Sequence, residues 1–245
     1  MFSTVFGKLF PQKSESIGEV TEGPEKIKSF IFDALNEYRS AIFPQGIIAF
    51  SDKFECQVKG DKVQSDVVIT ITLPFPCISE LTILSNTLSG ILQVNVSFDL
   101  CIDIKKVRQH NIANVGNVIA IASGKGGVGK STTAVNLAYA LIAEGATVGI
   151  LDADIYGPSI PSMLGHKDTK PTSVDGKLMQ PIEVHGLNAM SIGFLVPDEE
   201  ATVWRGPMAS SAFSQLLNET AWPKIDYLII DMPPGTGDIQ LTLAQ

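Results

Sequence analysis

The sequence predicts two domains: a small α+β domain over residues 1–105 and an α/β domain with a mostly parallel sheet over 117–245, joined by a linker over 106–116. Short segments of alternating apolar and polar residues predict the first, because alternation is typical of a half-buried sheet. A continuous apolar strand, a glycine-rich loop and an amphipathic helix in succession predict the second. With 245 residues, 44% of them apolar, the chain can build two cores.

The first domain is expected to fold in the order α-β-β-α-β. A proline at its beginning favours the first helix, and a polar turn between two alternating runs predicts a β-hairpin. Prolines then end the second strand before another helical pattern begins. The expected elements are a helix over 24–38, strands over 56–58 and 67–73, a helix over 79–90 and a strand over 94–104.

The second domain is expected to begin with a β-α-β unit. Its parts are an apolar strand over 118–122, an amphipathic helix over 131–144 that ends at Gly145, and a buried strand over 147–151. Because a crossover helix connects parallel strands, this order predicts a parallel sheet. A later apolar strand over 227–230 leads into a second glycine-rich turn.

Residues 124–131 match the pattern G-x-x-x-x-G-K-[ST] and lie between a predicted strand and a predicted helix. Glycines let backbone N–H groups point at phosphate oxygens, and the helix N-terminus adds partial positive charge. Lys130 is expected to neutralise the β- and γ-phosphates and Ser131 to bind Mg²⁺. The pattern therefore predicts a nucleoside triphosphate site. Its expected residues are Gly124, Lys125, Gly126, Gly127, Val128, Gly129, Lys130 and Ser131.

Acidic residues follow two of the predicted strands. Asp152 and Asp154 come directly after the strand over 147–151, and Asp231 follows the strand over 227–230. The carboxyl ends of parallel strands face such a phosphate loop. Carboxylates there can bind Mg²⁺, for which Asp152 and Asp231 are the expected residues, and a carboxylate can also orient the attacking water. Taken alone, each is also compatible with a turn-forming residue at a strand end.

Four segments resemble known protein families. Residues 124–132, with the additional Lys125, resemble the deviant Walker A motif of the MinD/ParA/nitrogenase iron protein superfamily. Residues 152–161, 204–208 and 231–238 narrow the resemblance to the Mrp (ApbC-type) iron–sulfur cluster carrier P-loop ATPases.

The resemblance is strong over 117–245, and residues 1–105 resemble a diverged form of the iron–sulfur-assembly-type domain that precedes the ATPase in bacterial members. It implies ATP and Mg²⁺ as cofactors, a homodimer, and a [4Fe–4S] cluster that is bound and transferred to apoproteins. Iron–sulfur apoproteins and assembly factors are the implied partners.

The resemblance also implies individual roles. The position of Lys125 reaches the phosphates bound by the partner subunit, and that of Thr132 contacts the α-phosphate. Asp154 corresponds to the residue that orients the hydrolytic water, and Asp231 to the Walker B aspartate. Lys125, Lys130 and Asp154 are therefore the expected catalytic residues.

Members of this family carry a C-x-x-C pair after the segment over 231–238, whereas the three cysteines here are Cys56, Cys77 and Cys101. The family's iron–sulfur ligands are thus not in this sequence. We expect it to be the N-terminal part of a longer protein or a truncated product, because a helical pattern that begins at Asp238 stops after about two turns. Cys77 is either a cluster ligand or an ordinary buried thiol.

Charge and hydropathy exclude other classes. The formal net charge of −8 provides no positive field for general nucleic-acid binding. No apolar run has the ~18–20 residues that would span a membrane, so a cytoplasmic protein without stable membrane association is expected. The apolar pattern over residues 2–10 fits either a membrane-surface helix or an arm packed on the protein.

The leading hypothesis is an ATP-hydrolysing iron–sulfur cluster carrier. One alternative is a MinD/ParA-type positioning ATPase, which binds a membrane or DNA. Another is a truncated, non-catalytic chain whose N-terminal domain serves only as an interaction module.

Overall fold

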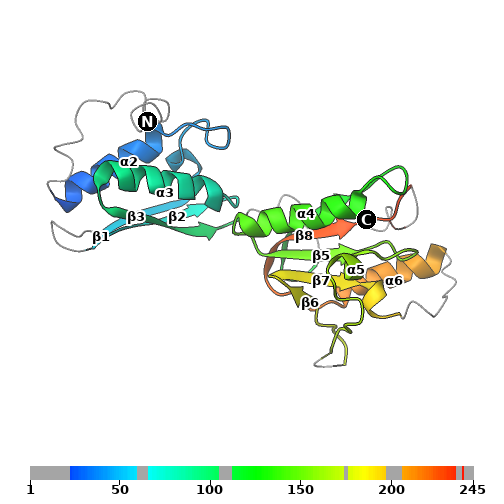
Figure 1. Cartoon of the computed structure of the whole chain (residues 1–245). Coiled ribbons are helices and arrows are strands. Elements are labelled where there is room, and N and C mark those ends of the chain that lie inside the picture. The colour runs from blue at the N-terminus through cyan, green and yellow to red at the C-terminus, as the bar shows by residue number, and fades with distance from the viewer. Residues whose placement is uncertain are drawn as a thin grey trace. The chain divides into compact units, whose positions relative to one another are not determined.

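A computed structural model of the chain describes residues 23–59, 66–104, 112–173, 176–196, 206–235 and 239. The chain divides into two compact units, Met1–Ile104 and Lys105–Gln245 (Figure 1). The expected apolar arm over 2–10, the residues Trp204 and Arg205, and the helix expected after Asp238, apart from Ile239, lie outside the described residues. No helix in the described ranges is long and apolar enough to cross a membrane.

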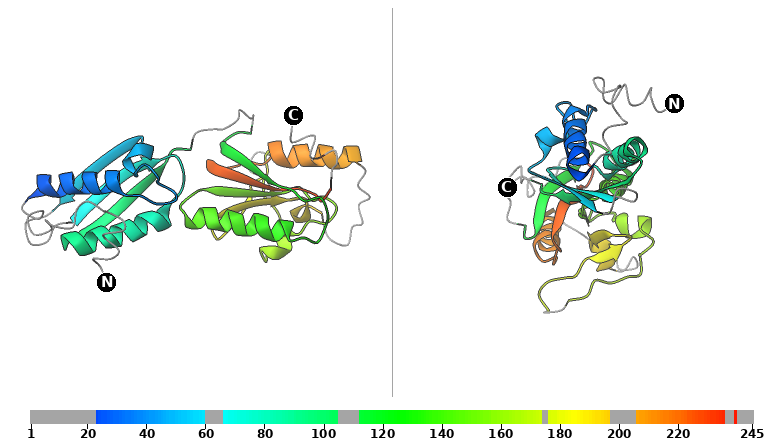
Figure 2. Two further views of the ribbon diagram at one scale, coloured as in Figure 1. Left: turned by 90° about the horizontal axis from the view of Figure 1, so that it is seen from above. Right: turned by 90° about the vertical axis from the view of Figure 1, so that its left-hand side faces the viewer.

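The first unit contains two helices and a three-stranded sheet of order β1-β2-β3. Strand β1 is antiparallel to β2, whereas β3 is parallel to β2, and both helices lie on the same face of the sheet (Figures 1 and 2). Its elements are α2 (Pro24–Glu37), η2 (Ile48–Phe50), β1 (Lys53–Lys59), β2 (Asp66–Leu73), α3 (Ile78–Leu92) and β3 (Asn95–Ile102).

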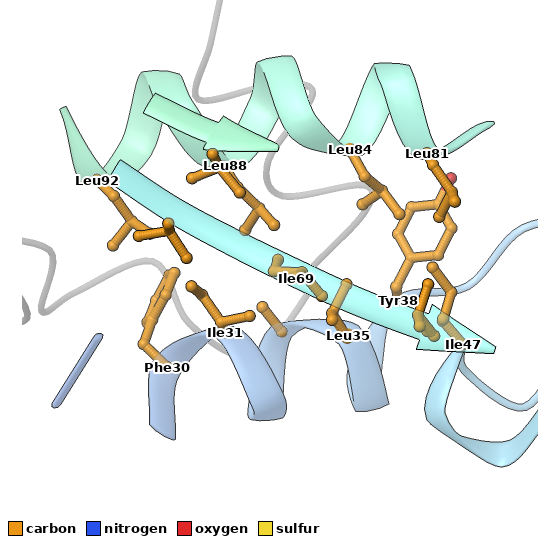
Figure 3. Close-up of a cluster of buried hydrophobic side chains, with 14 of the residues drawn as sticks. Phe30, Ile31, Leu35, Tyr38, Ile47, Ile69, Leu81, Leu84, Leu88 and Leu92 are labelled. Atoms are coloured by element: carbon orange, nitrogen blue, oxygen red, sulfur yellow. The ribbon is translucent and has the colours of Figure 1, made fainter. Parts of the chain in front are cut away.

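The core of this unit comes from alternate residues of β2. Figure 3 shows Ile69 of this strand between Leu35 of α2 and Leu84 of α3, and all three side chains are fully buried. The intervening β2 residues are half-buried or exposed on the other face. The predicted α-β-β-α-β order and the antiparallel pairing of β1 with β2 are confirmed. Strand β1 begins at Lys53, three residues before the predicted strand, because exposed and half-buried residues alternate from that residue onward.

The second unit contains a five-stranded sheet of order β4-β8-β5-β7-β6. All neighbouring strands are parallel except β6 and β7, so the predicted mostly parallel α/β sheet is confirmed. The elements are β4 (Val115–Ile121), α4 (Lys130–Ala143), β5 (Val148–Asp152), α5 (Ile160–Met163), β6 (Ile182–Val184), β7 (Leu187–Ser191), η3 (Ile192–Phe194), α6 (Gly206–Asn218) and β8 (Ile225–Asp231).

Helices α4 and α6 cover opposite faces of this sheet (Figure 2). Ala138 of α4 belongs to one buried cluster with Ile150 of β5. The next strand residue, Leu151, belongs to a second cluster with Phe213 of α6. Because both faces of β5 and β8 are buried, the sequences of these two strands contain continuous apolar runs.

Strand β4 begins at Val115, so the predicted linker over 106–116 extends too far. Val115 pairs with Ile225 of β8 and is buried. A Cβ at Gly116 would lie 2.6 Å from the carbonyl oxygen of Asp226, so only glycine allows the two strands to approach this closely. Gly116, predicted as the last residue of the linker, therefore belongs to the sheet.

Candidate nucleotide site

The predicted phosphate loop connects the end of β4 to the start of α4. Gly127 and Gly129 have φ angles of 73° and 86°, a region that favours glycine. A Cβ at either position would meet no atom of the described residues within 4 Å, so the loop faces open space. No side chain in the described part of the chain caps the N-terminus of α4. Its first backbone N–H groups are therefore placed to donate hydrogen bonds to an anion.

Lys130 and Asp231 form an ion pair that brings the phosphate loop to the carboxyl end of β8. Lys130 Nζ lies 2.5 Å from Asp231 Oδ1 and 3.4 Å from Ser131 Oγ. The Asp231 side chain is fully buried, and its Oδ2 has no hydrogen-bond partner among the described residues. Because a buried unpaired acceptor costs about 1–3 kcal/mol, this oxygen fits a site that binds a cation or its water.

Asp152 lies beside Asp231 in the register of β5 and β8. Its Oδ1 accepts the N–H of Asp154 at 3.1 Å, and its Oδ2 accepts the N–H groups of Ser159 and Ile160 at 3.0 and 3.1 Å. The Ser191 hydroxyl also donates to Oδ2, at 3.1 Å. Coordination of Mg²⁺ by Asp152, as the sequence predicts, would require at least one of these hydrogen bonds to be exchanged.

Burial has the largest effect on the pKa values of the two aspartates after β5. The pKa of Asp152 is raised to about 7: burial raises it most, the charge of Asp231 acts in the same direction, and the hydrogen bonds that Asp152 accepts lower it. Burial also raises the pKa of Asp154, against which the positive charge of Lys130 acts. That electrostatic effect indicates that Asp154, which is half-buried, lies within reach of the phosphate loop.

The other predicted residues of the loop are more open. Lys125, Val128 and Thr132 are exposed, and the backbone oxygen of Lys125 accepts the Ser123 hydroxyl at 3.0 Å. The structure thus groups Lys130, Ser131 and Asp231, places Asp152 next to Asp231, and leaves Lys125 and Thr132 facing solvent.

Sequence reasoning missed Ser191, which ends β7 and donates to Asp152. A search for polar residues at the carboxyl ends of apolar strands would have found it. The strand itself escaped prediction because its five residues, with Asn188 in the second position, show neither a long apolar run nor strict alternation.

The cysteines lie in the first unit. Cys77 is buried at the N-terminus of α3, Cys56 of β1 is half-buried, and Cys101 of β3 is exposed. All three are free thiols. No group of three or more His, Cys, Asp or Glu side chains in the described ranges could hold a metal ion. The observed contacts therefore assign no cluster ligand.

A parallel sheet with a glycine-rich loop between β4 and α4, and aspartates at the ends of the neighbouring strands β5 and β8, defines the second unit as a P-loop NTPase. The family model described as ParA, NUBPL iron-transfer P-loop NTPase, matches residues 114–245, more than half of the chain. The chain belongs to this family.

Curated relatives carry the name iron–sulfur cluster carrier protein. That of Salmonella typhimurium is 68% identical over 143 residues, which cover 58% of this chain and 39% of the relative. That of Deinococcus radiodurans is 44% identical over 192 residues, or 77% of this chain and 54% of the relative. The chain thus spans about two fifths to slightly more than half of the length of these relatives.

Among solved structures, a nucleotide-binding protein from Archaeoglobus fulgidus, determined in complex with ADP, is 40% identical to this chain. The alignment covers 55% of this chain and 51% of that protein, with a TM-score of 0.47.

Proposed function

We propose that the second unit binds and hydrolyses ATP with Mg²⁺, as part of a carrier that binds a [4Fe–4S] cluster and transfers it to apoproteins. The ion pair between Lys130 and Asp231, with its unpartnered carboxylate oxygen, is the observation that carries the proposal. Membership of the iron-transfer P-loop NTPase family supports the nucleotide chemistry, and the names of the relatives support the cargo.

In this proposal Lys130 exchanges its ion pair with Asp231 for the phosphate oxygens of ATP. The glycine-rich loop and the N-terminus of α4 donate backbone N–H groups to the same phosphates. Thr132 contacts the α-phosphate from the first turn of the helix. Release of Asp231 by the lysine leaves a buried carboxylate that needs a new positive partner.

Ser131 and Asp231 are the residues that would hold Mg²⁺, which, when bound, neutralises charge on the phosphates. This small donor set fits an ion that usually keeps several waters and phosphate oxygens as ligands. Asp152 has both oxygens in hydrogen bonds and joins the coordination only if one of them is exchanged. Asp154 accepts a proton from the attacking water and orients it.

A homodimer completes the proposed site, with Lys125 of each subunit reaching the phosphates bound by the other. The exposure of Lys125 beside the phosphate loop is compatible with that role. Iron–sulfur apoproteins and assembly factors are the proposed partners, in the cytoplasm and without nucleic acid or stable membrane association. The acidic net charge of −8 supports the absence of nucleic acid.

Equilibrium binding of a fluorescent ATP analogue with Mg²⁺ tests the nucleotide site. We expect Lys130→Ala to weaken binding by about a hundredfold or more, because the loop loses its charged phosphate ligand. The exposed Lys170→Ala is the control for loss of one positive charge and should bind as the wild type does. Equal affinity of the Lys130→Ala variant and the wild type would contradict the proposal.

A further inference from the structure

Three buried polar side chains end three neighbouring strands of the second unit. Asp231, Asp152 and Ser191 are the last residues of β8, β5 and β7, and all three are fully buried. Asp152 is paired in register with Asp231 on one side and with Ser191 on the other. Asp231 contacts Lys130, but no step of the proposed ATP chemistry uses Ser191.

The Ser191 hydroxyl has a defined direction. Its oxygen accepts the N–H of Gly193 at 3.0 Å and lies 3.1 Å from Asp152 Oδ2. A hydroxyl has one proton, and a backbone N–H can only donate, so the Ser191 proton points to the carboxylate. Ser191 therefore occupies one acceptor position of Asp152.

Asp152 holds the segment that follows β5 at two places. It accepts the N–H of Asp154 near the start of the segment, and those of Ser159 and Ile160 at its end. Ser191 donates to the same oxygen as these last two groups. The buried Asp152 carboxylate thus connects Ser191, at the end of β7, to both ends of the loop over residues 154–160.

The turn after Ser191 also packs against this loop. A Cβ at Gly193 would lie 3.1 Å from atoms of Pro158 and Pro161, so η3 is in close contact with the end of the segment. The hydrogen bond reaches the loop through Asp152, and the packing reaches it at Pro158 and Pro161; the two contacts come from Ser191 and Gly193, which are two residues apart at the junction of β7 and η3. Displacement of Ser191 would therefore loosen both.

We infer that Ser191 is a positioning residue of the nucleotide site, which acts through Asp152 to fix the backbone over residues 153–160 and so the place of the Asp154 carboxylate. The inference rests on the proposed role of Asp154 in orienting the attacking water. It predicts that Ser191 affects the hydrolytic step and leaves the affinity for ATP unchanged, because the phosphate loop is a separate segment.

The test compares Ser191→Ala with the wild type in the full chain. Single-turnover hydrolysis of ATP should slow by about tenfold, while the dissociation constant for ATP changes by less than about twofold. Amide hydrogen exchange of a peptide spanning residues 153–161 should accelerate, because a donor that holds Asp152 is lost. Ser191→Cys has similar volume and a weak donor, so it should give an intermediate rate and replaces Ser191→Ala if that variant does not fold.

Thr220→Val is the matched control. Thr220 is also buried, but its hydroxyl donates to Leu216 in α6 and not to Asp152. Its loss should leave both the hydrolysis rate and the exchange of residues 153–161 as in the wild type.

Two results would overturn the inference: unchanged exchange of residues 153–161 in the Ser191 variants, or equal losses of hydrolysis and of ATP affinity. Absence of hydrolysis in the wild type would count against the proposed function instead. The exchange experiment would then still decide whether Ser191 positions the loop.

Discussion

The two units use their sheets differently. In the first unit both helices pack on one face of three strands, and the other face presents polar residues to solvent. In the second unit helices cover both faces of five strands, and the buried polar residues Asp152, Ser191 and Asp231 are gathered at the carboxyl ends of three of them.

Burial of polar groups has a cost in stability that the first unit largely avoids. Among the residues that the structure describes, its fully buried side chains are apolar, whereas the second unit buries two carboxylates on adjacent strands. Desolvation and like charge disfavour this arrangement unless hydrogen bonds, a lysine or a ligand compensate. Apolar packing therefore organises the first unit, whereas the second unit gives up stability where buried carboxylates line its candidate nucleotide site.

The largest effect is expected from Asp154→Asn, which should separate hydrolysis from binding. The amide keeps the size of the side chain but accepts a proton poorly, so ATP hydrolysis should fall by about a hundredfold or more. ATP affinity should stay within about twofold of the wild type. Measured turnover and equilibrium binding, with the exposed Asp168→Asn as control, check both expectations. Loss of ATP binding would instead place Asp154 in the metal site or in the fold.

Truncation of the apolar core of the first unit should destabilise that unit alone. Ile69→Ala removes a fully buried β2 side chain and should cost about 3 kcal/mol. Both tryptophans, Trp204 and Trp222, belong to the second unit. In a thermal scan followed by circular dichroism, the unfolding transition of the first unit should therefore move to lower temperature. The transition followed by tryptophan fluorescence, which reports on the second unit, should stay at the same temperature.

Thr70→Ala, on the half-exposed face of the same strand, is the control for Ile69→Ala and should shift neither transition appreciably. An equal shift of the fluorescence transition in Ile69→Ala would mean that the two units unfold together, and the comparison between them would fail.

The stability of the second unit should depend on pH through Asp152. Because burial raises its pKa to about 7, the folded protein holds a proton that the unfolded chain loses near pH 4. This contribution to stability therefore falls as pH rises from about 4 to 7 and is constant above that. Without nucleotide or Mg²⁺, the melting temperature of the wild type minus that of Asp152→Asn should fall by several degrees between about pH 5 and 8.

Tryptophan fluorescence provides the melting temperatures for that comparison, and Asp168→Asn serves as the control at an exposed position. A difference between the wild type and Asp152→Asn that does not change with pH would show that Asp152 is ionised throughout.

Local patterns predicted most of the long elements and the candidate residues of the phosphate loop, but they missed β7 with Ser191 and gave none of the contacts. The sequence 124–131 and the aspartates after two apolar strands were sufficient to predict the phosphate loop and its facing carboxylates. The four hydrogen bonds of Asp152 join residues up to 39 positions apart, which no local pattern records. Gly116 was misread for the same reason, since its requirement for glycine comes from Asp226, far away in the sequence.

The smallest expected effect concerns a polar contact of Tyr38, a core residue labelled in Figure 3. The Tyr38 hydroxyl donates to Glu80 Oε1 at 2.6 Å, and the ring is almost fully buried. Tyr38→Phe keeps the ring but removes this bond, and half-buried Glu80 regains water, so the loss should be about 1 kcal/mol. Urea denaturation followed by circular dichroism measures this loss of stability.

Glu80→Gln is the control. Because glutamine retains an acceptor for the Tyr38 hydroxyl, this variant should lose less stability than Tyr38→Phe. If Tyr38→Phe leaves stability unchanged, this hydrogen bond does not stabilise the first unit, and the contrast with the second unit becomes sharper.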